Sequence, residues 1–207
     1  MKLNHQFFPR VTGRLVVVIM AGALLGLVAC SKNSPWKTKD ISGLMPNLQF
    51  TLTEANRDTT VTAKDYLGKV LLLYFGYTNC PDVCPTTLSR FKNIVSTLGP
   101  LAKPVRVLFV TVDPKRDTLE QMKSYTNYFG PEFIGLRGTQ DELHALTKSY
   151  RVTYGYDKPD AHGNYEVSHS SGVYVFDTTG KARLLIRPTD SIAAIDHDLR
   201  KLLSESE

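Results

Sequence analysis

The sequence has little cysteine and no long apolar segment. Only three of its 207 residues are Cys and one is Trp. Its one extended apolar run, from Leu15 to Ala29, is shorter than the roughly 20 residues that a membrane-spanning helix needs. A content of 42% hydrophobic residues excludes a disordered or collagen-like chain, and the single run excludes a polytopic membrane protein. We therefore expect one globular domain.

The sequence also lacks a clustered excess of basic or acidic residues. Of the 25 Lys and Arg residues, Lys2, Arg10 and Arg14 lie in the first 14 residues, which contain no acid. The other 22 basic residues face 20 acidic ones and never form a run longer than two. Binding to a polyanion requires a clustered basic surface. The sequence thus predicts no nucleic-acid partner.

The N-terminal segment has the pattern of an export signal, with basic residues followed by the apolar run. The sequence Leu27-Val28-Ala29-Cys30 resembles the lipobox of bacterial lipoproteins. That resemblance implies removal of residues 1–29, a lipid on Cys30 and a tether over residues 30–45. The protein would be a membrane-anchored lipoprotein facing the periplasm or another extracytoplasmic space, in either the inner or the outer membrane. An uncleaved apolar anchor is the alternative.

Strand-like and helix-like segments alternate from Pro46 onward. A strand at 48–53 is expected to pair with residues 61–62, and helices are expected after Pro85, at 118–129, at 139–150 and from Ile192 onward. Continuous apolar runs at 70–76 and 105–112 predict buried parallel strands, and 172–176 with 182–186 predict a hairpin. This order is typical of a thioredoxin-like α/β domain, here over residues 46–207: a central mixed sheet flanked by helices, with an N-terminal strand pair.

Cys80 and Cys84 lie between the first buried strand and the first long helix, at the edge of the sheet where sites of α/β proteins are built. If Cys30 is lipidated, this pair is all the cysteine that the folded part has. A bridge closing so small a loop removes little chain entropy, so a structural clip is a weak explanation. A redox couple or a soft-metal site remains. Free N–H groups at the helix N-terminus predict that Cys84 favours the thiolate.

Two thiolates cannot complete a tetrahedral zinc site, whereas two thiolates and one imidazole suit copper. His169 lies just before the 172–176 strand, which in a thioredoxin-like layout packs against the cysteine turn. We interpret His144, His162 and His197 as surface or structural residues, while His5 belongs to the signal.

The ordered motifs YFGYTNCPDVCPTTL, VTVDPKRDT, FIGLRGT and SHSSGVYVFD resemble the Sco/SenC family of copper-binding assembly factors for cytochrome c oxidase. The resemblance implies that Cys80, Cys84 and His169 bind one copper ion per chain. It also implies a metallochaperone that serves the apo binuclear copper site of oxidase subunit 2. Asp82 and Asp113 match acidic positions of the family, with a role beside the ligands or in docking.

Three residues depart from the family pattern. Ser168 precedes the histidine where the family often has Asp, so no carboxylate from that position orients the imidazole. Tyr77 and Asn79 replace residues that are commonly Phe and His, which removes a possible auxiliary ligand.

A thiol:disulfide oxidoreductase is the alternative function, which leaves open whether the protein is an enzyme. Cys80 and Cys84 would then be a redox-active pair, whose dithiol reduces oxidised cysteines of the oxidase copper site and closes to a Cys80–Cys84 disulfide, or which acts in redox sensing. Three residues between the cysteines, rather than two, favour a metal, as does the lack of proline from 160 to 187. A peroxidase and a disulfide clip are weaker explanations.

The expected partners are oxidase subunit 2, other periplasmic copper carriers or thiol reductants, and the membrane through the lipid anchor. The sequence leaves open whether Cu(I) or Cu(II) is the working state, which oxidase is served and how many chains associate.

Residues Lys115, Arg116 and Asp117 are expected in a solvated turn that caps a helix. Met122 and the aromatic residues of the 70–76 strand are expected in the core.

Overall fold

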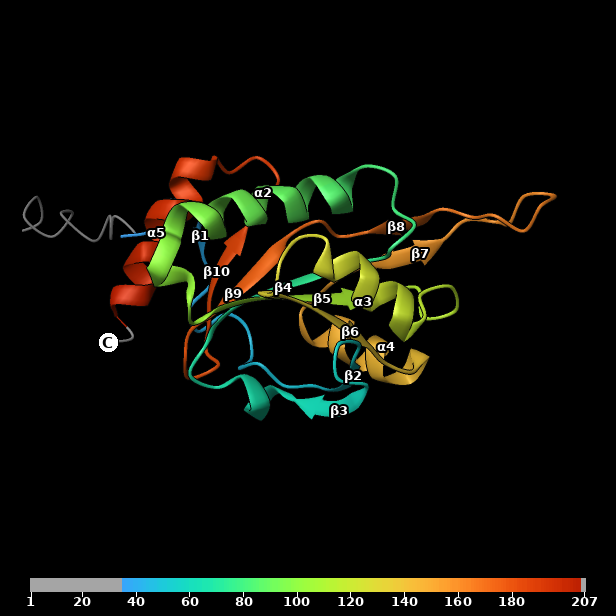
Figure 1. The fold of residues 1–207 in the computed structure, drawn as a ribbon, viewed down its shortest axis with the longest axis horizontal. Helices are drawn as coiled ribbons and strands as arrows, with labels where there is room; N and C mark the ends of the chain where they lie inside the picture. Colours follow the sequence, from blue (N-terminus) through green and yellow to red (C-terminus); the bar gives the residue numbers. More distant parts are fainter. Residues whose placement is uncertain (1–34, 206–207) are drawn as a thin grey trace, which may run out of the picture. The chain divides into compact units, whose positions relative to one another are not determined.

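The computed structural model describes residues 35–205, of which the part from Trp36 onward is one compact unit. An eight-stranded mixed sheet carries helices on both faces (Figure 1). Cys30 and the expected signal peptide lie outside the described residues. Within residues 35–205, no helix has the length and apolar character required to cross a bilayer.

The strands of the sheet follow the order β1-β10-β9-β4-β5-β6-β2-β3. Three neighbouring strands at its centre, β4, β5 and β6, are parallel, and the remaining pairs are antiparallel. The bounds of the strands are β1 Lys39–Asp40, β2 Thr51–Glu54, β3 Thr59–Thr62, β4 Val70–Gly76, β5 Val105–Thr111, β6 Phe133–Arg137, β9 Val173–Phe176 and β10 Ala182–Ile186. A separate antiparallel arm consists of β7 Tyr154–Tyr156 and β8 Val167–His169.

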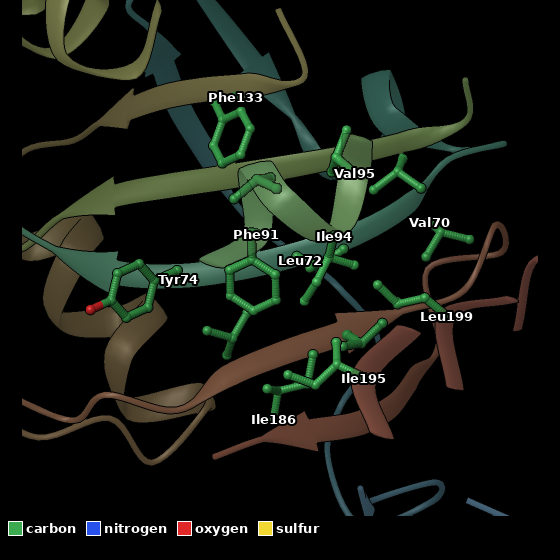
Figure 2. Packing of buried hydrophobic residues seen from close by; sticks show 14 of the residues in the cluster. Val70, Leu72, Tyr74, Phe91, Ile94, Val95, Phe133, Ile186, Ile195 and Leu199 are labelled. Atoms are coloured by element: carbon green, nitrogen blue, oxygen red, sulfur yellow. The ribbon is translucent and has the colours of Figure 1, made fainter. Parts of the chain in front are cut away.

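Helices α2 (Val83–Leu98), α3 (Leu119–Asn127) and α5 (Ile192–Ser204) supply one core layer, and α4 (Gln140–Ser149) supplies the layer on the other face. Short 3-10 helices, η2 (Ala63–Tyr66) and η3 (Gly99–Ala102), precede β4 and β5. Figure 2 shows the first layer, in which α2 and α5 side chains meet the even-numbered residues of β4.

Strand β4 is buried at every position because successive side chains enter opposite cores. Leu71, Leu73 and Phe75 pack on the α4 side, while Val70, Leu72 and Tyr74 pack on the α2 side. Burial of one such aliphatic or aromatic side chain contributes about 1.5–3 kcal/mol. The continuous apolar run therefore fixes β4 in the middle of the sheet.

Most expected elements are confirmed. β4 and β5 are parallel with Val70 opposite Val105, and β9 and β10 form the hairpin. Thr118 and Thr139 cap α3 and α4 as capping boxes with Gln121 and Glu142. Helix α2 starts at Val83, two residues before Pro85. Pro85 is tolerated at this place because a proline in the first helical turn removes no hydrogen bond.

Three features differ from the expectation. Strand β6 was not predicted, since Gly135 interrupts its apolar pattern; that glycine leaves room for Met122, whose Cβ would lie 3.2 Å from an added Cβ. The sequence pattern does not predict the β7–β8 arm, whose strands are only three residues long. β1 pairs with β10, so residues 36–45 lie in the folded unit rather than in the tether.

Candidate metal centre

The two cysteines lie on the turn that leads from β4 into α2. Cys84 is in the first turn of α2 and is fully buried, whereas Cys80 is half-buried in the preceding turn. The Cys84 sulfur packs against Gly76 at the end of β4: an added Cβ there would lie 2.8 Å from Sγ and 2.6 Å from the Phe109 ring. The absence of a side chain at Gly76 therefore lets the start of α2 approach the sheet.

His169, the last residue of β8, completes the cluster. Its Nε2 lies 3.3 Å from Cys84 Sγ, and its Nδ1 lies 3.0 Å from the carbonyl oxygen of Ser170. Because Nδ1 donates its proton to that carbonyl, the lone pair of Nε2 faces the cysteines. A backbone oxygen thus orients the imidazole, while Ser168 is exposed and donates to the Gly155 carbonyl instead.

These three side chains could hold one metal ion. Their ligand atoms all lie within 4.8 Å of one another, and both cysteines are free thiols. The Cys84 backbone N–H donates to Cys80 Sγ over 3.4 Å, which turns the Cys80 sulfur toward Cys84. In the described part of the chain, no other cluster of three or more Cys, His, Asp or Glu side chains has this geometry. Two sulfurs and one nitrogen form a soft, three-ligand set suited to copper.

Burial dominates the electrostatics of the site. It raises the pKa of the Cys84 thiol to about 12, so the expectation that the helix N-terminus favours its thiolate is wrong for the metal-free protein. Loss of solvent outweighs the helix N–H groups at this position. Burial also lowers the pKa of His169, which keeps the imidazole neutral, the form that binds a metal.

Two tyrosines enclose the imidazole. The rings of Tyr74 and Tyr77 each meet His169 edge-on, with centroids 6.1 Å away. The Tyr74 hydroxyl is fully buried beside Thr87 and the Cys84 thiol, but it makes no well-formed hydrogen bond. The sequence interpretation of Tyr74 as ordinary core missed its position beside the site; its spacing of two from Gly76, on the same face of β4, is the signal that could have located it.

The two acidic residues named from the sequence have different surroundings. Asp82 is exposed at the N-terminus of α2 and accepts a hydrogen bond from Thr86 Oγ1 at 3.3 Å. Asp113 is fully buried, pairs with Arg116 and accepts from the Tyr165 hydroxyl at 2.8 Å. Only Asp82 is placed to meet a docking partner.

In the DPKRDT segment Lys115 is exposed, as expected, but the expectation of a solvated turn is wrong for Arg116 and Asp117. Asp117 is fully buried and accepts hydrogen bonds from Thr78 and Thr111, while burial raises the pKa of its carboxyl. Arg116 is three-quarters buried against the Tyr165 ring. An alternation of charged residues in a short turn does not show whether their partners lie in segments distant in sequence.

The other histidines lie apart from the cysteines. His144 and His162 are exposed on α4 and in the loop of the arm, and His197 contacts Asp198 at 2.8 Å. Met122 is buried in the core, as expected.

An open groove beside the cysteine turn is lined mainly by residues of the turn and of β8, among them Tyr77, Cys80, Asp82, Val83, Glu166 and His169.

Comparison with known proteins identifies relatives of this arrangement. Residues 42–204 match the SCO1/SenC family model. A SCO2-like protein from Rickettsia felis is 40% identical over 115 residues, which cover 55% of this chain and 56% of that protein. The chain spans about half the length of the curated relatives it matches.

Solved structures extend the similarity to the fold. Bradyrhizobium japonicum ScoI with copper bound superposes with a TM-score of 0.68 at 34% identity, covering 75% of this chain and 98% of that one. Arabidopsis thaliana ScoI with copper bound gives a TM-score of 0.71 at 29% identity, covering 77% and 98%. The expected thioredoxin-like fold is confirmed. The match to the family model over most of the described residues shows that the chain belongs to the SCO1/SenC family.

Proposed function

We propose that the protein binds one copper ion through Cys80, Cys84 and His169 and serves in the assembly of cytochrome c oxidase. The observation that carries this proposal is the convergence of three soft ligand atoms within 4.8 Å at the edge of the sheet. Relatives whose structures were solved with copper bound share the fold and the family. Two thiolates and an imidazole leave a coordination position open to a ligand from a partner.

The cargo would pass to the apo binuclear copper site of oxidase subunit 2. Half-exposed Cys80 and the open groove beside it give an incoming ligand access, while buried Cys84 holds the ion from the core side. Exposed Asp82 and Glu166 line the same groove and give it a negative rim for docking. Other periplasmic copper carriers or thiol reductants would load the site or keep it reduced.

A lipid tether suits a membrane-bound partner. We propose that residues 1–29 form a lipoprotein signal, that Cys30 carries the lipid and that the domain faces the extracytoplasmic side. Because Trp36 already belongs to the folded unit, the free tether would reach from Cys30 to Pro35. Mass spectrometry of the membrane-extracted protein tests this: a diacylglyceryl group on Cys30 with loss of residues 1–29 is expected, and an intact N-terminus contradicts it.

A copper titration of the reduced full chain in detergent tests the metal site. We expect one copper ion per chain and a thiolate-to-Cu(II) charge-transfer band, both lost or strongly weakened in His169→Ala. His144→Ala is the matched control, since its exposed imidazole lies on α4. Equal effects of the two variants would contradict the ligand set.

The same experiment separates copper binding from disulfide exchange. In the exchange reaction, two thiols of Cys80 and Cys84 become a disulfide while a partner's disulfide is reduced to two thiols. Rapid exchange of this kind by a chain that retains no copper would replace the metallochaperone by a thiol:disulfide oxidoreductase.

A further inference from the structure

A buried polar loop lies beside the metal centre and has no part in the function proposed above. The loop consists of residues 113–117, between β5 and α3. Its Asp113 and Asp117 are both fully buried, although carboxylates are rarely buried unless they are paired. Their partners show what the loop holds in place.

One set of partners belongs to the cysteine turn. Asp117 Oδ2 accepts from the Thr78 backbone N–H at 3.0 Å, and Oδ1 accepts from the Thr78 hydroxyl at 2.5 Å. The Thr111 hydroxyl, in the last residue of β5, donates to Oδ2 at 2.5 Å. Thr78 lies two residues before Cys80. A single carboxylate therefore fixes the start of the cysteine turn to the end of β5.

The other set belongs to the arm that carries His169. Arg116 Nη1 donates to the Tyr165 carbonyl at 2.8 Å, and the guanidinium lies 3.7 Å from the Tyr165 ring centroid. The same guanidinium lies 5.6 Å from the Tyr77 ring centroid. Tyr165 lies just before β8, four residues from His169. The same guanidinium thus contacts both the arm and the cysteine turn.

The loop is itself anchored to the sheet. Arg137 in β6 donates to the carbonyls of Asp117 and Pro114 at 2.9 and 2.8 Å. The Asp113 carboxylate holds Arg116 and accepts from the Tyr165 hydroxyl at 2.8 Å. A loop fixed to β6 in this way can act as a rigid reference for the two segments that carry the ligands.

We propose that Asp117 and Arg116 are positioning residues: Asp117 sets the place of the Cys80 turn, Arg116 sets the place of β8, and together they fix the distance between Cys80 and His169. Neither residue touches the ion. Their effect on the metal passes through Thr78 and Tyr165, so it changes ligand geometry and not ligand identity.

The test compares Asp117→Asn and Arg116→Lys with Asp177→Asn in the full chain. The amide introduced by Asp117→Asn has one acceptor oxygen and turns a donor toward Thr78 or Thr111, and the lysine introduced by Arg116→Lys lacks the planar fork that meets Tyr165. Asp177 is a matched control, because it also accepts from a threonine N–H and hydroxyl, those of Thr179, but in the turn between β9 and β10. All three variants are first checked for a cooperative thermal transition.

The first measurement is a Cu(II) titration that follows the thiolate-to-Cu(II) band and the copper affinity, and it rests on the proposed function. Asp117→Asn and Arg116→Lys should shift the energy or intensity of the thiolate-to-Cu(II) band and weaken copper binding about tenfold, which is ~1.4 kcal/mol. Asp177→Asn should lower thermal stability while leaving the band unchanged. Variants that lose stability alike and all keep the wild-type band would overturn the positioning role.

Amide hydrogen exchange of the metal-free protein supplies the second measurement, so that a chain that binds no copper still tests the inference. Asp117→Asn should speed exchange of the Cys80 amide, which donates to the Tyr77 carbonyl, and Arg116→Lys should speed exchange of the Ser170 amide, which donates to the Thr153 carbonyl. Asp177→Asn should leave both unchanged. Unaltered exchange at both amides in the two loop variants would refute the proposal whatever the copper result.

Discussion

The two ends of the central sheet are built differently. At the end where β4 and β5 begin, backbone hydrogen bonds close the turns: Gly68 N–H donates to the Thr178 carbonyl and Val70 N–H to the Pro104 carbonyl. At the end where these strands finish, polar groups are buried without partners. Of the five such atoms in the described part of the chain, those of Tyr74 and Tyr125 lie near the cysteine pair and that of Arg116 lies beside Tyr77, while the other two belong to Asn56 and Asp196.

This difference indicates where the fold gives up stability for chemistry. A buried hydroxyl without a partner costs about 1–3 kcal/mol, so a protein retains it where something other than stability is at stake. The site end also keeps a buried thiol and a buried neutral imidazole in contact. The opposite end carries no such cluster among residues 35–205.

The largest expected effect on stability comes from Gly76→Ala, which adds one methyl group at the site end of the sheet. Gly76→Ala places a Cβ 2.6 Å from the buried Phe109 ring and 2.8 Å from Cys84 Sγ, so Phe109 or Cys84 must shift. We expect a loss of about 3 kcal/mol in the free energy of unfolding, the upper range for overpacking, together with weaker copper binding. Urea unfolding and copper titration measure the two effects.

Gly68→Ala is its control at the opposite end. No atom lies within 4 Å of the added Cβ, but the backbone has a φ of +81°, so the cost is about 1 kcal/mol of backbone strain. Copper binding should not change. If Gly68→Ala weakened copper binding as much as Gly76→Ala, the separation between the two ends would fail.

A smaller effect is expected from removing single hydroxyl groups. Tyr74→Phe deletes a buried hydroxyl that lies beside Thr87 and the Cys84 thiol without a well-formed hydrogen bond, so the unfolding free energy should change by less than about 1 kcal/mol. Tyr174→Phe is the matched variant on β9: its hydroxyl donates to the Tyr150 carbonyl at 2.6 Å, and its loss should cost about 1–2 kcal/mol. Chemical denaturation compares the pair, and an equal loss in both would show that the Tyr74 hydroxyl is satisfied.

The parts of the fold that the sequence predicts are those set by local sequence, and the parts that it does not predict depend on distant partners. Local sequence signals are enough to predict β4, the βαβ unit and the capped helices, because periodicity and capping act within a few residues of sequence. The candidate site residues Cys80, Cys84 and His169 could also be named from the sequence, because residue type, position relative to the predicted strands and the family resemblance all point to them. The features that the sequence did not predict depend on partners far apart in sequence: the buried Asp117 carboxylate accepts from Thr78, and Gly135 is in a strand because it pairs with Phe109 of β5.

The smallest expected effect is a difference in the pH dependence of two buried carboxylates. Hydrogen bonds from Thr179, Lys181 and Arg183 hold the pKa of Asp177 below its usual range, despite burial, whereas burial raises the pKa of Asp117. An unfolded aspartate titrates near 3.9. For Asp177, the unfolded chain binds the proton more tightly, so its contribution to stability is present above that pH and is lost as the pH falls through the folded pKa.

For Asp117 the sign is reversed. The folded chain binds the proton more tightly than the unfolded chain, so this group adds stability as the pH falls from its raised pKa toward the unfolded value. Thermal unfolding of the metal-free protein between pH 6 and pH 3 measures both contributions, a range set around the unfolded value of about 3.9. Asp177→Asn should flatten the loss of stability at the acidic end of that range, and Asp117→Asn should steepen the overall decline toward low pH. The same change of slope in both variants would show that the two ends of the sheet hold their carboxylates alike.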